Sequence, residues 1–188
     1  MCKSKLNELF EILSLNYLVN HNKLFIKMRI IRTADLCDDY IDQLQVALPI
    51  GLQNFGGNTV FHGEIVTVKC LDNNPLIRET LSEKGNGRVL VVDGEASKKC
   101  ALTGDNIAKL AHDNGWAGIL INGCIRDSVA ISNLEIGVKA LYTNPIKSGK
   151  SSVGEVNVPI TFAGITFYPG HYLYSDEDGI VISESRLH

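Results

Sequence analysis

The sequence predicts an α/β fold with a parallel βαβ core and antiparallel C-terminal strands. Two short apolar runs, Val89–Val92 and Ala117–Ile121, each end in turn residues, as buried strands do. Between them, Ile107, Leu110 and Ala111 recur at helical spacing. Two strands joined by a crossover helix form a βαβ unit, so we expect these strands to be parallel. Short strand patterns beyond residue 157, separated by turn residues, predict the antiparallel part.

The composition is that of an ordinary soluble globular protein, with 45% hydrophobic and 21% charged residues in a chain of 188. A net charge of −3 argues against direct nucleic-acid binding. No apolar run approaches the roughly 20 residues of a membrane span. The five cysteines are scattered and form no C-x-x-C pair, which argues against a zinc site and a disulfide framework and favours a cytoplasmic location.

The first 27 residues differ from the rest and are predicted to be an N-terminal extension. Leu6, Phe10, Leu13 and Tyr17 repeat at helical spacing, which predicts an amphipathic helix that packs on the body or on a partner. We place no function in this extension. Residues 28–188 are then predicted to form one domain, long enough to bury a hydrophobic core.

Three elements are predicted before the core. Residues 33–47 (TADLCDDYIDQLQVA) indicate a helix capped by Thr33. The alternating pattern of Phe61–Cys70 predicts a strand. Asn74-Pro75 is typical of a helix start, and Gly85 of the end of that helix.

Beyond the core, a short helix is predicted at Val129–Leu134 and a strand at Val138–Tyr142. Residues 144–157 are polar and are either a mobile lid or an exposed connection, of which the connection is the commoner case. The remaining predicted strands are Val158–Phe162, Ile165–Tyr168, Tyr172–Tyr174 and Ile180–Ser183.

The βαβ unit also predicts where a ligand would bind. In such units the ligand crevice lies outside the carboxyl ends of the strands. Asp105 opens the crossover helix, and Arg126 and Asp127 follow the second strand, so the three should converge on one rim. An arginine there can bind a carboxylate and stabilise an oxyanion. The simpler alternatives are that Asp105 only caps its helix and that Arg126 is a surface residue.

The start of the crossover helix is itself a candidate anion site. It is formed by Gly104, Asp105, Asn106 and Ile107. Free backbone N–H groups and the positive end of the helix dipole favour a bound anion at such a position.

Three acidic positions invite a metal-binding interpretation. Asp127 could be a hard oxygen ligand for Mg²⁺ or Mn²⁺, with waters completing the coordination. Glu95, in the Asp93-Gly94-Glu95 segment, could orient the residues that bind a ligand or be only a turn residue, and the turn is the favoured interpretation. The acid-rich Asp176–Gly179 segment lacks the full ligand series of a calcium loop, so a hairpin turn is the favoured interpretation.

Taken together, several segments make the chain resemble the regulator of ribonuclease activity A (RraA-like) family, over about residues 31–183. The segments that carry the resemblance are TADLCDDY at 33–40, NFGGNTVFHGEIVTVKC at 54–70, GRVLVVDGEAS at 87–97, GWAGILINGCIRD at 115–127 and LYSDEDGIVIS at 173–183. Class II aldolase members of this family carry an Asp, twenty residues and then Arg-Asp, a pattern that Asp105, Arg126 and Asp127 match.

The resemblance implies a fold, an activity and an assembly. The fold is a swivelling α/β/β sandwich, and the assembly is a homotrimer or a dimer of such trimers. The implied activity is the divalent-metal-dependent cleavage of 4-hydroxy-4-methyl-2-oxoglutarate, a 2-oxo acid, to two pyruvates. Oxaloacetate decarboxylation is implied as a secondary activity, because it passes through the same pyruvate enolate.

The resemblance also implies roles for individual residues. The pyruvoyl carboxylate would lie on the backbone N–H groups of Gly104–Ile107 and on Arg126. Asp127 would hold Mg²⁺ or Mn²⁺, and Arg126 with the metal would stabilise the enolate. Asp105 would position a water for proton transfer.

Two departures from the family pattern and two alternative functions accompany this interpretation. Gly94-Glu95-Ala96-Ser97 stands where members usually have Gly-Gly-Gly-Ser, and the sequence stops at His188, whereas longer aldolases continue into a segment that supplies an acid to a neighbouring subunit.

The main alternative is a non-catalytic protein that binds and inhibits a ribonuclease, against which the retained Asp127 argues. A methyltransferase is a weaker alternative, because no G-x-G-x-x-G loop is present.

Overall fold

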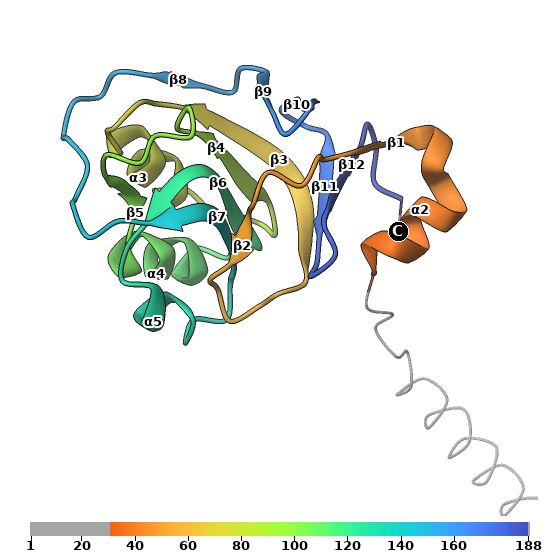
Figure 1. Cartoon of the computed structure of the whole chain (residues 1–188), viewed down its shortest axis with the longest axis horizontal. Helices are drawn as coiled ribbons and strands as arrows, with labels where there is room; N and C mark the ends of the chain where they lie inside the picture. Colours follow the sequence, from red (N-terminus) through yellow and green to blue (C-terminus); the bar gives the residue numbers. More distant parts are fainter. Residues whose placement is uncertain (1–30, 188) are drawn as a thin grey trace, which may run out of the picture. The chain divides into compact units, whose positions relative to one another are not determined.

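The structure, a computed structural model, describes residues 31–187, so the predicted extension at residues 1–27 lies outside the described part. The helical elements are α2 (Thr33–Tyr40), η1 (Ile41–Gln43), α3 (Pro75–Ser82), α4 (Asp105–Asp113) and α5 (Ser128–Ile131) (Figure 1). The strands are β1 (Leu44–Val46), β2 (Gln53–Asn54), β3 (Phe61–Lys69), β4 (Val89–Asp93), β5 (Ala101–Thr103), β6 (Gly118–Ile125), β7 (Gly137–Thr143), β8 (Glu155–Val156), β9 (Ile160–Phe162), β10 (Ile165–Phe167), β11 (Tyr172–Ser175) and β12 (Ile180–Ser183).

A mixed sheet of 10 strands organises the described residues, in the order β1-β12-β11-β3-β4-β6-β7-β2 with β5 and β8 off this path. The predicted parallel core is confirmed, because β4 pairs in parallel with both β3 and β6, and β6 with β7. Strand β3 belongs to both parts of the sheet. Its first half, Phe61–Glu64, pairs antiparallel with β11, and its second half, Ile65–Lys69, pairs with β4.

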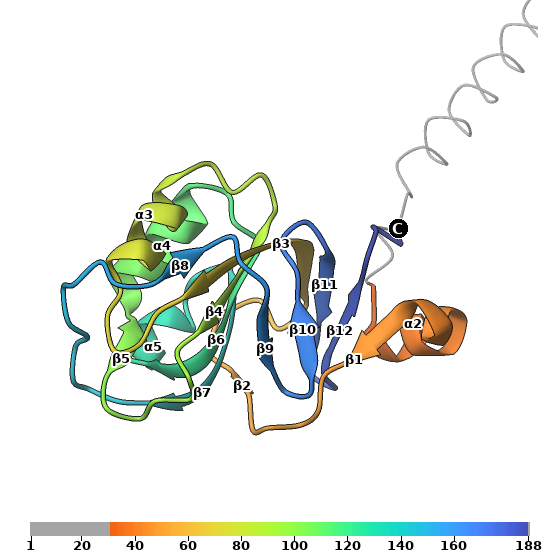
Figure 2. The same cartoon turned by 90° about the horizontal axis from the view of Figure 1, so that it is seen from above.

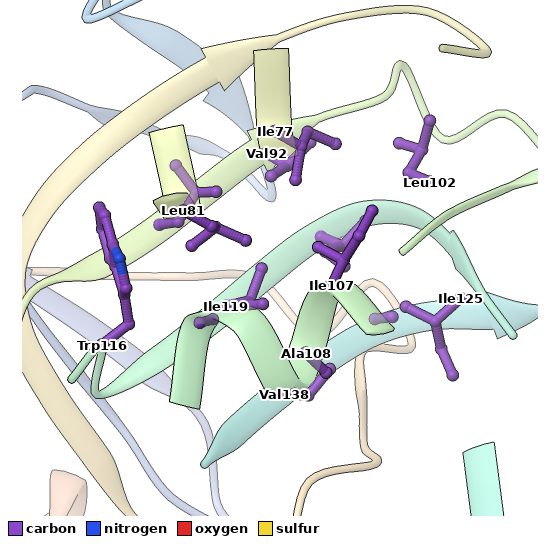
Figure 3. Close-up of a cluster of buried hydrophobic side chains, with 14 of the residues drawn as sticks. Ile77, Leu81, Val92, Leu102, Ile107, Ala108, Trp116, Ile119, Ile125 and Val138 are labelled. Carbon is purple, nitrogen blue, oxygen red and sulfur yellow. The ribbon is translucent and has the colours of Figure 1, made fainter. Parts of the chain in front are cut away.

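The three helices α3, α4 and α5 lie on one face of the parallel strands. Right-handed crossovers between strands that advance in one direction, β3 to β4 to β6 to β7, place every helix on the same side. Figure 3 shows α3 contributing Ile77 and Leu81 and α4 contributing Ile107 and Ala108 to a buried cluster against the sheet. Strands buried on both faces are mostly apolar, and all eight residues of β6 are buried, including the polar Asn122.

The opposite face of the parallel strands is covered by strands instead of helices. The β9–β10 hairpin packs there, with the Phe162 and Phe167 rings stacked 4.5 Å apart between centroids. Figure 2 shows this hairpin and the α3–α4 pair on opposite sides of the sheet. The chain therefore has an α/β/β arrangement with antiparallel C-terminal strands, as the sequence predicts.

The second strand of the core is longer than predicted. Asn122-Gly123 does not end it, and β6 continues to Ile125 with an irregularity in its pairing with β7 between Ile121 and Cys124. Asn122 stays in the strand because its side-chain amide donates to Asp93 (2.8 Å) and its carbonyl accepts from Gly94 N–H (3.0 Å). The short strand β5, within the predicted loop, pairs in parallel with the far end of β6.

The predicted helix at residues 33–47 is wrong in its second half. It ends at Tyr40, and Leu44–Val46 form β1, which pairs antiparallel with β12 at the edge of the sheet. Pairing with a distant strand outweighs local helical spacing here. Thr33 is the first helical residue and not the cap, and its N–H and Oγ1 both donate to Asp176, at 2.7 Å each.

The predicted hairpin turn at Asp176–Gly179 is confirmed and contains a buried carboxylate. Asp176 is 1% exposed and also accepts from the N–H groups of Asp178 (3.0 Å) and Gly179 (3.2 Å). Burial alone would raise the pKa of Asp176, but the hydrogen bonds from Thr33 and the turn outweigh it and lower the pKa. The buried Lys139 ammonium donates to the carbonyls of Asp176 and Gly179, which joins β7 to the same turn.

Burial also lowers the pKa of Lys139, and the acids of the neighbouring turn oppose this effect only in part.

None of the helices described in residues 31–187 is long and apolar enough to cross a membrane.

We expect Asp176→Asn to lower the free energy of unfolding by about 2 kcal/mol at pH 7, because an amide nitrogen would face the Thr33 N–H donor and the charge would be lost. A lowered folded-state pKa contributes stability above the unfolded value of about 3.9, and this stability is lost as the pH falls through the folded pKa. The difference between variant and parent should therefore shrink below about pH 4. Urea unfolding at pH 7 and pH 3 measures it. Asp178→Asn, an exposed acid of the same turn, is the matched control, and equal effects of the two variants would contradict the role of Asp176.

Candidate active site

The two segments predicted to converge do meet at the carboxyl ends of the parallel strands. The N–H of Arg126, the residue after β6, donates to the carbonyl of Thr103, the last residue of β5, at 2.9 Å. Gly104 follows Thr103 and is the N-cap of α4. Arg126-Asp127 and the start of α4 are therefore joined by backbone, although twenty residues separate Asp105 from Arg126.

Gly104 lies so close to Arg126 and Asp127 that a side chain there would collide with them. A Cβ at residue 104 would be 2.7 Å from Asp127 Oδ2 and 3.1 Å from Arg126 Nε. Its φ of −131° and ψ of −173° are ordinary extended values, so space and not backbone conformation requires glycine. The short distances also show that both charged groups border the start of the helix.

Arg126 and Asp127 form an ion pair with each other. The distance from Arg126 Nε to Asp127 Oδ2 is 3.3 Å, and both side chains are more than a third exposed. Asp127 adopts a left-handed backbone conformation with φ 57°, which turns the chain sharply between β6 and α5. The pair is therefore held at a tight corner, with the remaining guanidinium nitrogens of Arg126 available to a ligand.

At the start of α4, the backbone N–H groups differ in whether they have a partner. Asn106 N–H donates to the carboxylate of Asp105 (2.7 Å), and Ile107 N–H donates to the carbonyl of Gly104 (3.1 Å). For the N–H groups of Gly104 and Asp105, the structure gives no partner within residues 31–187. These two, with Arg126, are the donors open to an anion. The side chain of Ile107 is buried in the core and holds the helix against the sheet.

A cavity of about 160 Å³ lies at this rim. It contains Gly104, Asp105, Asn106, Ile107 and Arg126, so every predicted substrate-binding residue lines it. Asp127 is not among the lining residues, but it is ion-paired to Arg126, which is, and its Oδ2 lies close to Gly104. The cavity is further lined by Asn74, Arg78, Ala101, Lys147, Ser148 and Lys150.

The sequence analysis missed those further lining residues. Asn74 and Arg78 lie at the start of α3, the helix that follows the parallel strand β3. The rule that ligands bind at the carboxyl ends of parallel strands placed Asp105 at the site, and it could have placed these two residues there as well. Asn74 is also the N-cap of α3, and its amide donates to the Leu102 carbonyl at 3.0 Å. Lys147, Ser148 and Lys150 lie in the polar loop, and no local pattern marks them.

The polar loop is held by backbone contacts where it borders the cavity. Ala101 N–H donates to the Ile146 carbonyl, and Gly149 N–H donates to the Asp72 carbonyl, both at 2.8 Å. Lys147 and Gly149 form isolated bridges with Ala101 and Asn73. A connection anchored on both sides of Ser148 has the character of a cavity wall, not of a lid.

The segment after β4 is the turn that the sequence predicts, and Glu95 is exposed in it. The buried Asp93 carboxylate accepts from Glu95 N–H at 2.9 Å. Glu95 and Ala96 have φ values of 55° and 54°, a left-handed conformation that residues with a Cβ rarely adopt. Glu95 does not line the cavity.

The donors around Asp127 suit a magnesium-type ion better than zinc. Among residues 31–187 no group of three His, Cys, Asp or Glu side chains could hold a metal. Asp127 offers an Oδ1 without a hydrogen-bond partner in the described part of the chain, next to a cavity with a second carboxylate, that of Asp105. Mg²⁺ commonly binds through one or two carboxylates and keeps several waters, so this arrangement fits it.

A family model described as "RraA-like: Aldolase/RraA" matches residues 33–182, which contain the whole site. The chain belongs to the RraA-like family. A protein of Alkalilimnicola ehrlichii is 52% identical over 155 residues, which cover 82% of this chain and 96% of that protein. One of Laribacter hongkongensis is 54% identical, with 82% of this chain and 97% of that protein covered. Both are provisionally named 4-hydroxy-4-methyl-2-oxoglutarate aldolase.

Solved structures of this RraA-like fold carry other names. A protein of Geobacillus kaustophilus, named S-adenosylmethionine:2-dimethylmenaquinone methyltransferase, is 44% identical with a TM-score of 0.82, over 84% of this chain and 97% of that one. A Thermus thermophilus protein named the RNA-processing inhibitor RraA is 39% identical with a TM-score of 0.81, over 84% of this chain and 95% of that one.

We expect Glu95→Gly to raise the free energy of unfolding by about 0.5–1 kcal/mol. Relief of the left-handed strain contributes about 1–2 kcal/mol, and the extra freedom of glycine in the unfolded chain offsets part of it. Urea denaturation of both proteins checks the difference. Glu95→Gln, which keeps the Cβ and removes the charge, should leave stability nearly unchanged. A gain for the Gln variant equal to that of the Gly variant would mean that charge, and not backbone conformation, is responsible.

Proposed function

We propose that this RraA-like protein is a divalent-metal-dependent aldolase that cleaves 4-hydroxy-4-methyl-2-oxoglutarate to two pyruvates, with oxaloacetate decarboxylation as a secondary activity. The observation that supports it most is the convergence of Gly104, Asp105 and Arg126 on one small cavity, with Asp127 ion-paired to Arg126. The provisional names of relatives about half identical to this chain point to the same reaction.

In this proposal, binding and charge stabilisation come from the rim of the parallel sheet. The carboxylate of the pyruvoyl group accepts from the Gly104 and Asp105 N–H groups at the positive end of α4, and from Arg126. Cleavage of the carbon–carbon bond leaves negative charge on the oxygen of the 2-oxo group. The Arg126 guanidinium is already oriented by Asp127, so it can stabilise this developing charge without reorganisation.

The reaction also needs proton transfer, because cleavage removes the proton of the 4-hydroxyl group and the enolate carbon must then gain one. Asp105 lines the cavity at the first residue of α4 and positions a water that takes the proton from the 4-hydroxyl group or delivers one to the enolate carbon. Its carboxylate is oriented by two hydrogen bonds from Asn106, one from the backbone (2.7 Å) and one from the side-chain amide (2.9 Å). Asn106 therefore has a positioning role.

Asp127 would hold the divalent cation through its carboxylate, with waters as the other ligands. Bound there, the cation would supply Lewis-acid polarisation of the 2-oxo group. We also propose that the protein assembles as a homotrimer and that the bound cation is Mg²⁺ or Mn²⁺.

A second function, inhibition of a ribonuclease by direct contact, is favoured by the likeness to the Thermus thermophilus RNA-processing inhibitor. The two functions are separable by experiment. An RNA cleavage assay with candidate ribonucleases, run with the purified protein and with Arg126→Ala, tests inhibition independently of the cavity.

We expect Arg126→Ala to lower kcat for pyruvate formation by about 100-fold or more, because one preorganised donor to an oxyanion is lost. A coupled pyruvate assay with 4-hydroxy-4-methyl-2-oxoglutarate and Mg²⁺, with and without chelator, measures it. Lys109→Ala is the control. It also removes a cation near α4, but Lys109 is ion-paired with Asp113 (2.8 Å) and does not line the cavity, so this variant should keep full activity. Asp127→Asn should weaken Mn²⁺ binding measured by calorimetry without substrate. Metal-independent turnover, or no pyruvate from the parent protein, would refute the proposal.

We expect Gly104→Ala to lower kcat/KM by about tenfold or more while the protein still folds. The added methyl group would meet side-chain atoms of Arg126 (Nε and Cγ) and of Asp127 (Oδ2), and no backbone atom is among its three nearest neighbours, so the site changes more than the fold. Kinetics and a thermal melt give the two readouts. Gly179→Ala adds a methyl group into open space and is the matched control. Unchanged kinetics for Gly104→Ala would show that the Arg126–Asp127 arrangement has no role in turnover.

A further inference from the structure

Strand β5 connects the candidate site to the rest of the sheet, although it is short. Its last residue, Thr103, accepts from the Arg126 N–H, and its first residue, Ala101, lines the cavity. β5 has three residues, and its pairing with β6 shifts in register between Ala101 and Thr103. Three residues is the lower end of the usual strand length, so strand pairing alone fixes β5 weakly. The contacts of the segment that leads into β5 therefore matter for where it lies.

The carboxylate of Asp72, in the turn after β3, holds that leading segment. Asp72 Oδ1 accepts from Ser97 Oγ at 2.5 Å and from Cys100 Sγ at 3.7 Å. The shorter distance is typical of a strong, charge-assisted bond between a hydroxyl group and a carboxylate. Cys100 directly precedes β5, and burial together with the neighbouring Asp72 raises the pKa of its thiol, so the thiol is a neutral donor at pH 7.

The backbone of Asp72 holds the opposite wall of the cavity. Its carbonyl accepts from the N–H of Gly149 at 2.8 Å, next to Ser148 in the polar loop. Asp72 has a left-handed backbone conformation with φ 55°, which aspartate tolerates better than most residues. Asp72 itself does not line the cavity. One residue outside the cavity therefore contacts the segments that form two of its walls.

Other side chains also bind the segment before β5, but more weakly. The Asn144 amide donates to the Lys98 carbonyl at 2.7 Å, and the Cys124 thiol donates to the Ser97 carbonyl at 3.5 Å. Both bonds join neutral groups, whereas the acceptor that reaches the residue next to β5 is a carboxylate. A hydrogen bond to an ionised group is roughly twice as strong as one between neutral groups.

We propose that Asp72 is a positioning residue for Arg126: its carboxylate fixes the segment from Ser97 to Cys100, which sets the position of β5 and of the Thr103 carbonyl that holds Arg126. The effect on turnover rests on the proposed function, but the effect on the Thr103–Arg126 bond does not. A misplacement of about 1 Å by a change far from the chemistry can lower a rate by roughly 100-fold. The loss of the Asp72 carboxylate should therefore be felt at the oxyanion.

Two substitutions separate the carboxylate from the backbone of Asp72. Asp72→Gly removes the acceptor and adopts the left-handed conformation without strain, whereas Asp72→Asn keeps an oxygen at the Oδ1 position. We expect kcat for pyruvate formation to fall about tenfold or more for the Gly variant and by less than about threefold for the Asn variant. Lys99→Met is the matched control, because Lys99 lies 3.8 Å from the same carboxylate but is 82% exposed. Equal losses for the Gly and Asn variants would contradict the role of the acceptor.

A double variant tests whether Asp72 acts through Ser97. Ser97→Ala alone should lower kcat less than Asp72→Gly does, because the bond from Cys100 remains. Added to Asp72→Gly, it should lower kcat little further, since the bond is already lost. Losses that multiply would show that the two residues act independently and would overturn the proposed link.

Amide hydrogen exchange separates this inference from the proposed reaction. Mass spectrometry of fragments that contain Arg126, or Val89–Asp93 of β4 as a reference, is run on the parent and on Asp72→Gly. We expect exchange to become faster at Arg126 and to stay unchanged in β4, because the Thr103–Arg126 bond opens locally. This result supports the inference even if the parent protein has no lyase activity.

Two other results of the exchange experiment would overturn it. Unchanged exchange at Arg126 would do so even if the lyase activity is confirmed. Equally faster exchange in β4 would mean that Asp72 stabilises the whole fold and has no particular link to Arg126. If Asp72→Gly does not fold, Ser97→Ala, which removes only the 2.5 Å bond, provides the same readout.

Discussion

The candidate site depends on one backbone hydrogen bond, from the N–H of Arg126 to the carbonyl of Thr103. This bond extends the parallel pairing of β5 and β6 by one residue, to the position where both strands end. The chain then turns into α4 on one side and into the Arg126-Asp127 corner on the other. Every group assigned to binding or catalysis is positioned relative to this bond, and the buried strands on both sides of it keep it dry.

Much of this arrangement could be predicted from the sequence. The apolar runs around Val89–Val92 and Ala117–Ile121 are long enough to be strands and too short to be helices, and the helical spacing between them leaves one topology. The rule that ligands bind at the carboxyl ends of parallel strands then brings Asp105 and Arg126 together before any coordinates are known. Local pattern and global fold agree in this part of the chain, which is why the prediction succeeds.

The parts that could not be predicted depend on partners far away in the sequence. Leu44–Val46 continue a helical pattern, but they pair antiparallel with β12. This strand pairing outweighs the local preference for a helix. Asn122-Gly123 has the composition of a turn, but the Asp93 carboxylate holds Asn122 in the strand. The net charge likewise conceals the cations around the cavity, because Lys147 and Lys150 join Arg78 only after the polar loop is anchored at Asp72 and Ala101.

The pairing of β1 with β12 has a consequence for the order in which the protein folds. β1 lies at the end of the sheet and has β12 as its neighbour there, and Thr33 at the start of α2 bonds to Asp176 in the turn between β11 and β12. A ribosome makes α2 and β1 early but completes β12 more than a hundred residues later. The parallel core can therefore begin to assemble during translation, whereas α2 and β1 gain their sheet partners only after β12 has been made.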